Sequence, residues 1–447
     1  MHKILIFVQK EKSGEFMRVA FYTLGCKVNQ YETGVLEQQF MNDGFDIVSP
    51  DEEADIYIVN SCTVTSTGDK KSRQALRRFK RKNPAAKAVL TGCFPQAFPD
   101  AAEKIPEADV ITGAANRLAV LDAVKRCLAS GERIIEITPH VKDEKFESMQ
   151  ATSFLDRTRA FIKIEDGCDR FCSYCIIPIS RGRVRSKPLE ELRQELTALA
   201  SSGYREVVLT GINLSSYGKD TGNRMIDAVK LACAAPGIER VRLGSLEPEL
   251  LSDEDISEMS KLGEFCDQFH LSLQSGCDRT LREMNRHYTA EEYDALVRKL
   301  RRVFPNCAVT TDIMVGFPGE TEEDFLENLA FAKKVGFAKV HVFAYSIREG
   351  TRAAKMEAQV PKQVKEQRSR RMIELTDKTR REFLSRQVGR IEEVLLEQLV
   401  SPGVYEGYTK NYTPVRIRSD LPLKGQIKFI KLTGITDDFC TGELLQF

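Results

Sequence analysis

The sequence has almost no excess of either charge and no long hydrophobic run. Its 66 Lys and Arg residues are balanced by 65 Asp and Glu residues, which leaves a formal net charge of +1. Any surface for nucleic acid must therefore be local. The apolar start, ILIFV, runs at once into QKEK, which is too short for a signal peptide or a membrane span. Solenoid-type repeats and low-complexity segments are also missing, so we expect a cytoplasmic globular protein with no membrane partner.

What the sequence does have is length and cysteine. A chain of 447 residues is too long for one hydrophobic core and predicts two or three domains. Its 12 cysteines would suit a disulfide scaffold only if the chain were small and exported. Because three of them cluster tightly in a long chain, we expect a reducing compartment and thiolates that serve a metal.

Three short apolar runs in the N-terminal region share one shape: VAFYTLGC (19–26), ADIYIVNSC (54–62) and AKAVLTGC (86–93). Amphipathic helical stretches lie between them, and this alternation predicts a parallel sheet. Parallel strands end along one edge, where open α/β sheets bind ligands. The runs end in Cys26, Cys62 and Cys93. We expect these cysteines to converge in space; the alternative is three ordinary buried cysteines.

Two further patterns follow along the chain. From RAFIKIEDGC to KVHVFAYS, six strand-like runs alternate with helices, which predicts a full or partial β/α barrel with its chemistry on the loops after the strands. The last segments are short and punctuated by Gly, Pro and Asn, which predicts an antiparallel β-barrel of about five strands. The predicted fold class is thus α/β: a Rossmann-like N-terminal domain, a central β/α barrel and a small C-terminal β-barrel. The predicted boundaries are 1–17 (extension), 18–128, 129–153 (linker), 154–384 and 385–447.

The stretch EDGCDRFCSYCIIP (165–178) holds three closely spaced cysteines: Cys168, Cys172 and Cys175. Three thiolates are one short of the four ligands of a closed site, and an open position is what a catalytic metal needs. Soft sulfur ligands favour an iron–sulfur cluster or zinc. Zinc is the competing metal, but the C-x3-C-x2-C spacing is unusual for it and no histidine lies nearby.

This motif, placed after the first strand of a β/α barrel, resembles that of the radical S-adenosylmethionine enzymes. Further stretches resemble the methylthiotransferase branch of that superfamily: TLGCKVNQYET, VNSCTVT, TGCFPQ, GCDRFCSYCIIPISRGRVRS, HLSLQSGCDRTLREMNRHYT and DIMVGFPGETEEDF. The C-terminal β-barrel resembles the TRAM domain, an RNA-binding module. Together these resemblances cover nearly the whole chain from Arg18 onward.

The resemblance implies two [4Fe–4S] clusters and S-adenosylmethionine as cofactors. Cys168, Cys172 and Cys175 would hold the first cluster, whose open iron binds the cofactor's amino and carboxylate groups, and reduction yields a 5′-deoxyadenosyl radical. The three N-terminal cysteines would hold a second cluster implicated in supplying sulfur. A second S-adenosylmethionine supplies the methyl group. Partners would be tRNA, a low-potential electron donor of the flavodoxin or ferredoxin type and a sulfur source.

The branch of the family determines the substrate. Its members act on tRNA adenosine 37 carrying a threonylcarbamoyl or an isopentenyl group, or on an aspartate of ribosomal protein S12. TLGCKVNQYET and RGRVRS resemble the threonylcarbamoyladenosine branch most, whereas the other two branches read closer to GCQMN and GCPKN at the first cysteine. IIPIS, in place of something like IIPYA, is a mild departure from the pattern.

The loop TGINLSSYG (210–218) resembles the superfamily loop that holds the methionine end of the cofactor; the alternative is an ordinary βα turn. Other strand ends suggest further pocket residues. The predicted cofactor-binding residues are Tyr174, Thr210, Gly211, Asn213, Ser245, Glu247, Gln274, Asp312 and Gly316. No catalytic residue beyond the cluster ligands is predicted.

Basic residues suggest where RNA binds. KKSRQALRRFKRK (70–82) is uninterrupted by acidic residues, and a polyanion would gain there from counterion release; the alternative is a solvated helix face. In the C-terminal barrel, tyrosines and basic residues mix, which suits stacking and phosphate contact unless the tyrosines only pack. The predicted RNA contacts are Arg77, Arg78, Arg181, Arg183, Arg185, Lys410, Arg416 and Arg418.

Six cysteines have no paired spacing and are predicted to be packing residues: Cys127, Cys233, Cys266, Cys277, Cys307 and Cys440. A reading from another class stays open at this point. In it, the chain is an RNA-binding protein without catalysis whose clustered cysteines hold zinc.

Overall fold

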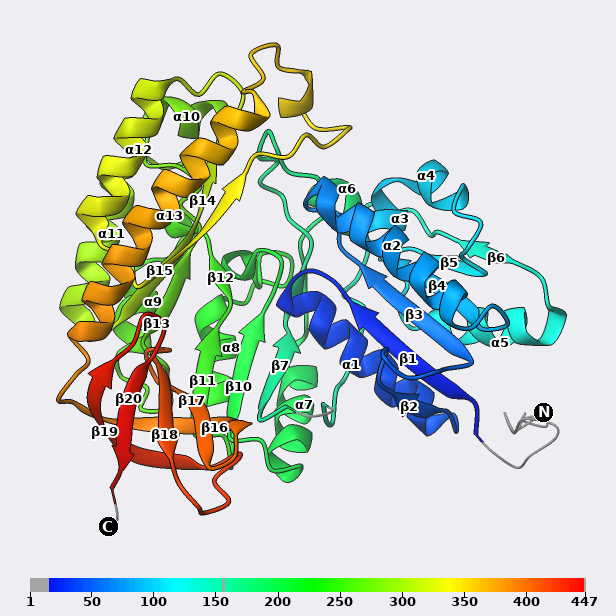
Figure 1. Ribbon diagram of the computed structural model, residues 1–447, viewed down its shortest axis with the longest axis horizontal. Helices are drawn as coiled ribbons and strands as arrows, with labels where there is room; N and C mark the ends of the chain where they lie inside the picture. The colour runs from blue at the N-terminus through cyan, green and yellow to red at the C-terminus, as the bar shows by residue number, and fades with distance from the viewer. Residues whose placement is uncertain (1–15, 155–156, 446–447) are drawn as a thin grey trace.

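The computed structural model describes residues 16–154 and 157–445, which form three units (Figure 1). The first is a sheet of six parallel strands in the order β2-β1-β3-β4-β5-β6. Every residue of β3, IYIVNS, is buried, as expected for a parallel strand covered on both faces. The strands are β1 (Arg18–Thr23), β2 (Asp46–Val48), β3 (Ile56–Ser61), β4 (Lys87–Gly92), β5 (Val110–Thr112) and β6 (Ile134–Glu136).

Helices cover both faces of this sheet. Leu76 and Phe79 of α2 pack on one face, and Leu36 and Phe40 of α1 join α5 on the other. The helices are α1 (Lys27–Asn42), α2 (Ser66–Lys82), α3 (Cys93–Ala97), α4 (Pro99–Glu103) and α5 (Val120–Ser130). The Rossmann-like prediction is confirmed. One part of the predicted linker 129–153 is corrected: residues 134–136 form β6, the sixth strand of the sheet.

The central unit is a partial parallel barrel made of two sheets, β11-β10-β7 and β12-β13-β14-β15. Its helices follow the apolar spacing of their sequences. In α11, for example, Thr289 and Glu292 form a capping box, and Tyr293, Val297 and Leu300 face the core one turn apart. The strands are β7 (Arg159–Lys163), β10 (Glu206–Thr210), β11 (Arg240–Leu243), β12 (Ser245–Leu246), β13 (Gln268–Leu271), β14 (Ala308–Val315) and β15 (Lys339–Ala344).

The barrel's helices lie on its outer side (Figure 1). They are α7 (Leu189–Ser201), α8 (Met225–Cys233), α9 (Asp253–Met259), α10 (Asp278–Glu283), α11 (Ala290–Val303), α12 (Glu322–Val335) and α13 (Lys362–Ser385). The short helix α6 (Ile177–Arg181) instead packs against α3 of the N-terminal domain. Two short strands, β8 (Glu165–Asp166) and β9 (Arg185–Ser186), pair antiparallel on either side of the cysteine loop.

The N-terminal domain bridges the two edge strands of the partial barrel. Helix α1 packs beside β7. At the other edge, the backbone N–H of Ser66 donates to Ser346 Oγ at 3.1 Å, and Arg348 pairs with Asp69 at 2.8 Å. The loops that follow the N-terminal strands therefore face the interior of the barrel.

The third unit is a closed five-stranded barrel in the order β16-β17-β18-β20-β19. Its pairs are antiparallel except β18 with β20, which is parallel. A ring of five strands cannot alternate in direction all the way round, so one parallel pair is unavoidable. The strands are β16 (Ile391–Ser401), β17 (Val404–Thr409), β18 (Pro414–Arg418), β19 (Ile427–Ile435) and β20 (Cys440–Leu444).

This barrel lies below the N-terminal ends of β7, β10 and β11 (Figure 1). Arg240 donates to the carbonyl oxygens of Tyr408 and Glu393 at 3.0 and 2.7 Å. Among the described helices, none has both the length and the apolar character needed to cross a membrane. Most of the predicted extension, residues 1–15, lies outside the described residues.

Candidate active site

The three N-terminal cysteines follow β1, β3 and β4, which are neighbours in the parallel sheet. Gly25, with φ +103°, lets the first loop approach the second: a Cβ atom there would lie 2.7 Å from Cys62 Cβ. The backbone N–H of Phe94, next to Cys93, donates to Ser61 Oγ at 3.1 Å. The predicted convergence of the three strand ends is therefore what the structure shows.

The surroundings of Cys62 and Cys26 favour the protonated thiols over thiolates. Burial, together with the neighbouring Cys93 and Cys26, raises the pKa of Cys62 to about 12. Burial also raises the pKa of Cys26. Soft metals bind thiolates and release protons, so three thiols at adjoining strand ends, of which one is exposed, one half-buried and one buried, fit an iron–sulfur cluster.

The second cysteine set sits on the loop between β8 and α6. The backbone N–H of Cys168 donates to Gly182 O at 3.0 Å, so the loop is held near both of its ends. Asn213 Nδ2 lies 3.6 Å from Cys168 Sγ, and Arg286 Nη1 lies 3.4 Å from Cys172 Sγ. Burial raises the pKa of Cys168 to about 11. Each of these two sulfurs thus already has a nitrogen donor aimed at it, which stabilises a thiolate.

Two of the predicted cofactor residues lie at this loop. Glu247 pairs with Arg286, whose Nη2 also donates to Ser272 O at 3.1 Å. The backbone N–H of Asn213 donates to Glu165 Oε2 at 2.6 Å. Asn213 Oδ1 and Glu165 Oε1 are buried and have no hydrogen-bond partner within residues 16–154 and 157–445. Unpaired buried acceptors beside an open cluster position fit a bound cofactor.

Six of the other predicted cofactor residues divide into three groups. Thr210, Gly211 and Ser245 line a cavity inside the barrel. Tyr174 packs edge-on against Phe317 beside the cysteine loop, whereas Gln274 and Gly316 act through their backbones. Gln274 N–H donates to Asp312 O at 2.9 Å, and Gly316 N–H donates to the Glu320 carboxylate.

Asp312 stands apart because it lies in the middle of β14 rather than at its end. Its Oδ2 is 3.4 Å from His270 Nε2, and His341 is its register partner on β15. His270, Asp312 and His341 offer ligand or hydrogen-bonding atoms that all lie within 4.8 Å of one another.

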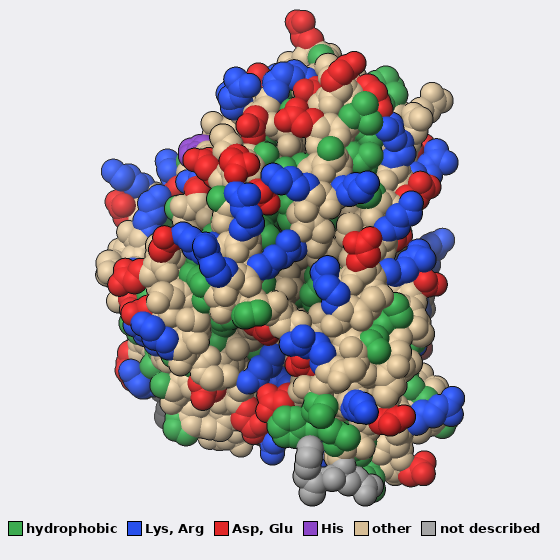
Figure 2. Space-filling model, turned by 90° about the vertical axis from the view of Figure 1, so that its left-hand side faces the viewer, with side chains coloured by type: hydrophobic (Ala, Val, Ile, Leu, Met, Phe, Trp, Pro, Cys, Tyr) green, Lys and Arg blue, Asp and Glu red, His purple; other side chains and the backbone are tan. Residues whose placement is uncertain are grey.

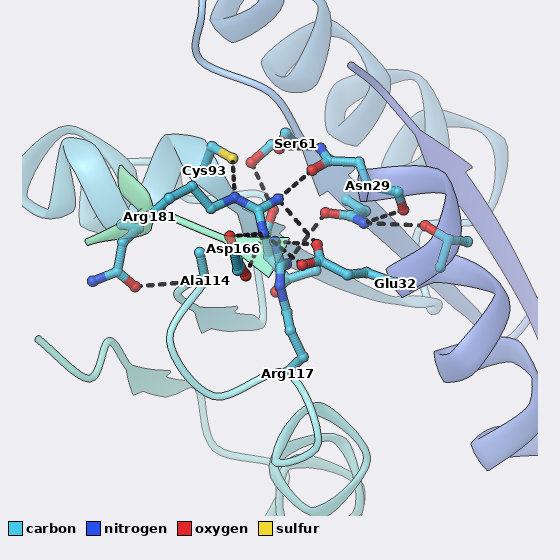
Figure 3. Close-up of polar contacts among 12 residues, drawn as sticks. Asn29, Glu32, Ser61, Cys93, Ala114, Arg117, Asp166 and Arg181 are labelled. Atoms are coloured by element: carbon cyan, nitrogen blue, oxygen red, sulfur yellow. Dashed lines mark hydrogen bonds and ion pairs between the residues drawn. The ribbon is translucent and has the colours of Figure 1, made fainter. Parts of the chain in front are cut away.

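Arg181, which follows the second cysteine loop in the chain, contacts Cys93 of the first set (Figure 3). Its Nε donates to Cys93 Sγ at 3.2 Å, and its Nη2 donates to Asn29 Oδ1 at 2.5 Å and to Glu32 Oε2 at 3.1 Å. The side chain is 0% exposed. Arg181 is the last residue of α6, immediately after the second cysteine loop, so one side chain joins that loop to a ligand of the first set.

The network around Arg181 contains more positive than negative side chains. Glu32 also pairs with Arg117 at 2.9 Å and with Lys163 at 3.0 Å, and Lys163 reaches Asp166 at 3.1 Å. Although burial opposes its ionisation, the three cations lower the pKa of Glu32 to about 2. Ionised cysteine thiolates would balance the remaining charge, which again fits a metal cluster at Cys93.

The structure corrects the prediction of RNA contacts at two positions. Arg181 and Arg185 are 0% and 5% exposed and pair with carboxylates inside the protein, so phosphates cannot reach them. Arg183, between them, is exposed. The other predicted contacts are exposed or partly exposed: Arg77 and Arg78 on α2, and Lys410, Arg416 and Arg418 on the C-terminal barrel.

Sequence reasoning missed Arg286, Glu32 and Lys163. Arg286 lies within the quoted stretch HLSLQSGCDRTLREMNRHYT. Glu32 lies three residues after Asn29 on α1, one helical turn along the same face. One signal in the sequence could have identified Glu32. It is an amphipathic helix that starts at a candidate ligand and carries a carboxylate one turn later. The six other cysteines are all buried, as packing residues are.

A cavity of about 640 Å³ joins the three units. Cys26 and Lys27 line it from the N-terminal domain, Asp312 from the central barrel, and Tyr408 and Tyr412 from the C-terminal barrel. Burial, with repulsion from nearby arginines, lowers the pKa of Lys27 to about 8, so its ammonium stays mostly protonated at neutral pH. The cavity extends from a ligand of the first cysteine set to the C-terminal barrel, through the barrel interior.

Residues 162–332 match the family described as the Radical SAM superfamily, and residues 18–113 match the Uncharacterized protein family UPF0004. Threonylcarbamoyladenosine tRNA methylthiotransferase MtaB of Bacillus subtilis is 38% identical over 420 residues, covering 93% of each chain. The chain belongs to the radical S-adenosylmethionine methylthiotransferase family. The MtaB protein of Thermotoga maritima is 39% identical, over 88% of this methylthiotransferase and 90% of that protein.

Another curated relative is the tRNA-2-methylthio-N(6)-dimethylallyladenosine synthase of Clostridium novyi, which is 35% identical over 95% of each chain. A solved structure of the radical S-adenosylmethionine methyltransferase TsrM from Kitasatospora setae aligns with a TM-score of 0.54 at 14% identity, covering 76% of this methylthiotransferase and 74% of that chain. This last likeness concerns the fold alone.

Proposed function

We propose that this enzyme adds a methylthio group to C2 of N6-threonylcarbamoyladenosine at position 37 of tRNA. The observation that carries the proposal is the 38% identity to the B. subtilis threonylcarbamoyladenosine tRNA methylthiotransferase over 93% of both chains. The relatives named for a dimethylallyladenosine product are 34–36% identical, which supports the same reaction class.

The cofactors are S-adenosylmethionine and [4Fe–4S] clusters. Cys168, Cys172 and Cys175 would hold the cluster that, with bound S-adenosylmethionine, supplies hydrogen abstraction from an unactivated carbon. Cys26, Cys62 and Cys93 would hold the second cluster, next to the site of sulfur transfer. We infer that a low-potential electron donor and a sulfur source complete the reaction.

The chain's own residues position these groups. Arg286 fixes Cys172 through its Nη1 and at the same time holds Glu247. Asn213 donates to Cys168 and keeps its Oδ1 free for the cofactor. The remaining predicted cofactor contacts, Tyr174, Thr210, Gly211 and Ser245, lie around the same loop and the adjoining cavity.

Mass spectrometry of tRNA nucleosides from cells with and without the gene tests the proposal. We expect 2-methylthio-N6-threonylcarbamoyladenosine to disappear and its precursor to accumulate. Loss of the isopentenyl counterpart, or of the S12 modification, would keep the enzyme class and change the substrate. If none of the three changes in a strain without a sister enzyme, the methylthiotransferase function is wrong.

Separate cysteine variants test the two-site arrangement. Cys172→Ala should lose one cluster and all reductive cleavage of S-adenosylmethionine. Cys62→Ala should lose the other cluster and keep that cleavage, because the two sets lie on different loops. Iron content, and 5′-deoxyadenosine formation measured under anaerobic conditions, distinguish the variants. If both variants lose cleavage equally while retaining the same amount of iron, the assignment of two separate sites fails.

A further inference from the structure

The cavity between the three units has an unusual residue in its wall. Lys27 is half-buried and lines the cavity, yet its side chain makes no hydrogen bond or ion pair within the residues that the structure describes. Two other cations that line the cavity are paired, Arg416 with Glu406 at 2.6 Å and Arg380 with Asp438 at 3.5 Å, and a further one, Lys339, is exposed. A cation without a partner in a confined space is costly, and it marks a place for a ligand of opposite charge.

The charges around Lys27 strengthen this point. Arg159 and Arg242 both lie over the ring of Tyr412, which lines the same cavity as Lys27. Both arginines are held by Glu206, with Arg242 Nε donating to its carboxylate at 3.0 Å. Arg159 also pairs with Glu397 at 2.7 Å, so both nearby carboxylates are occupied by these arginines and neither one neutralises Lys27.

The central barrel's part of the cavity lining supplies hydrogen-bond acceptors and donors. Alternate residues of β14 and β15 point into the cavity, which brings Asp312 opposite His341. His270, on β13, lies between the Asp312 carboxylate at 3.4 Å and Thr310 Oγ1 at 3.0 Å. The cavity lining therefore includes an ammonium group from the N-terminal domain and a carboxylate with two imidazoles from the central barrel.

An N6-threonylcarbamoyl group has the matching chemistry. It carries a carboxylate, a hydroxyl and ureido N–H groups, whereas an isopentenyl group carries none of these. We propose that this cavity is the subsite for the N6 substituent of the substrate, with Lys27 binding its carboxylate and Asp312 accepting its hydroxyl or N–H groups. The inference rests on the proposed function and identifies how the enzyme would select its substrate.

Such a site distinguishes the two substituents mainly because the wrong one leaves polar side chains of the cavity without a partner. An isopentenyl group would leave Lys27 and Asp312 desolvated and without partners. Sites that hydrogen-bond a polar group reject analogues that lack it by factors of about 10⁴ or more, whereas purely apolar pockets discriminate far less. Lys27 is adjacent to Cys26, so the bound carboxylate would also fix the base close to the first cysteine set.

The test compares two anticodon stem-loop RNAs that differ in one group. One carries N6-threonylcarbamoyladenosine at position 37, and the other carries its carboxamide, which has the same shape without the charge. Affinities are measured anaerobically on the cluster-loaded enzyme with S-adenosylmethionine present. We expect the wild type to bind the acid about tenfold or more tightly than the amide, as a charge-assisted contact predicts.

Variants of Lys27 assign the difference to one side chain. Lys27→Gln should bind both RNAs alike, and Lys27→Arg should keep part of the preference. Lys261→Gln, which changes an exposed lysine outside the cavity, should behave like the wild type. Iron content is measured first, and Lys27→Met replaces the Gln variant if that variant loses iron.

Two results would overturn the subsite. One is equal binding of acid and amide by the wild type, which needs no variant. The other is a wild-type preference that survives in an iron-replete Lys27→Gln or Lys27→Met variant. A third measurement concerns Asp312. If the wild type contains stoichiometric zinc and the His341→Gln variant loses it, the group of His270, Asp312 and His341 is a metal site and the proposed role of Asp312 is wrong.

The same RNAs separate failure of the subsite from failure of the proposed function. If the wild type forms methylthio product on the threonylcarbamoyl RNA but binds acid and amide alike, only the subsite fails. If it forms product on an isopentenyl RNA and none on the threonylcarbamoyl RNA, the proposed function fails and the subsite fails with it.

Discussion

At the scale of single residues, Arg181 carries the most information about the site. It donates to a thiol of one cysteine set and ends the helix that follows the other set. In the sequence it is one of three similar arginines in RGRVRS. The structure separates them because Gly182, with φ +71°, turns the chain before Arg183 is exposed and Arg185 enters β9.

Replacing Arg181 should change the electronic properties of the second cluster. Hydrogen bonds to cluster sulfurs and nearby positive charge stabilise the reduced state. In a Cys172→Ala background, Arg181→Met should therefore lower the reduction potential of the remaining cluster by on the order of 50 mV, the equivalent of one charge-assisted hydrogen bond. Potentiometry followed by electron paramagnetic resonance measures this shift.

The matched control is Arg183→Met, two residues along the same loop. Its side chain is exposed and makes no contact with Cys93 within the described part of the chain. The reduction potential of the remaining cluster in this variant should therefore equal that of the Cys172→Ala parent. Equal potentials for the two Met variants would show that Arg181 only packs.

At the scale of elements, strand and helix alternation was readable from the sequence. The three runs ending in Cys26, Cys62 and Cys93 became neighbouring parallel strands because apolar period and turn residues agree there. Strands of two or three residues such as β6, β8 and β9 left no such pattern, because pairing with neighbours and not local sequence creates them.

The role of the tyrosines in the C-terminal barrel could not be predicted from the sequence either. Tyr408 and Tyr412 stack on each other with ring centroids 4.6 Å apart, and Arg159 and Arg242 of the central barrel lie over their rings. Sequence composition suggests that such residues stack on nucleic-acid bases. Only the position of the C-terminal barrel against the central barrel reveals that they form a contact between the two units.

Tyr412→Ala should therefore destabilise the protein. Loss of the ring stack and of two cation–π contacts should reduce the free energy of unfolding by about 1–2 kcal/mol. Chemical denaturation measures this change. Arg418→Ala, at an exposed position of the same barrel, should leave stability unchanged and weaken tRNA binding. The reverse pattern would place Tyr412 in the RNA interface.

At the scale of the whole molecule, the distribution of charge limits where tRNA binds. On the face formed by α11, α12, α13 and the C-terminal barrel, positive and negative side chains are interspersed (Figure 2). Helix α2, on the N-terminal domain, instead exposes a run of cations: Lys70, Lys71, Arg77, Arg78, Arg81 and Lys82. Of these two surfaces, α2 would attract a polyanion more strongly, and the C-terminal barrel would add single contacts such as Arg418.

Removing part of this run should weaken tRNA binding without affecting the clusters. The triple change of Lys70, Lys71 and Arg81 to Ala should lower affinity and reduce the slope of log K against log salt by roughly 2–3 units, because about three phosphate contacts are lost. Filter binding at several salt concentrations measures both quantities.

The control changes three exposed cations on the outside of the central barrel: Arg193, Arg205 and Lys261. These changes alter net charge equally, so the control should keep the wild-type salt dependence. Equal slopes in the two triple variants would mean that α2 is a solvated face and not an RNA contact.

The buried network around Glu32 has a consequence for the supply of the enzyme in the cell. Its three cations face two carboxylates between the N-terminal domain and the barrel, and thiolates bound to metal would supply the missing negative charge. A chain that has not received its iron would therefore hold its two halves together less firmly. Proteases act on opened chains, so iron shortage would shorten the lifetime of this protein. The extent of tRNA modification would then follow iron availability through protein turnover as well as through catalysis.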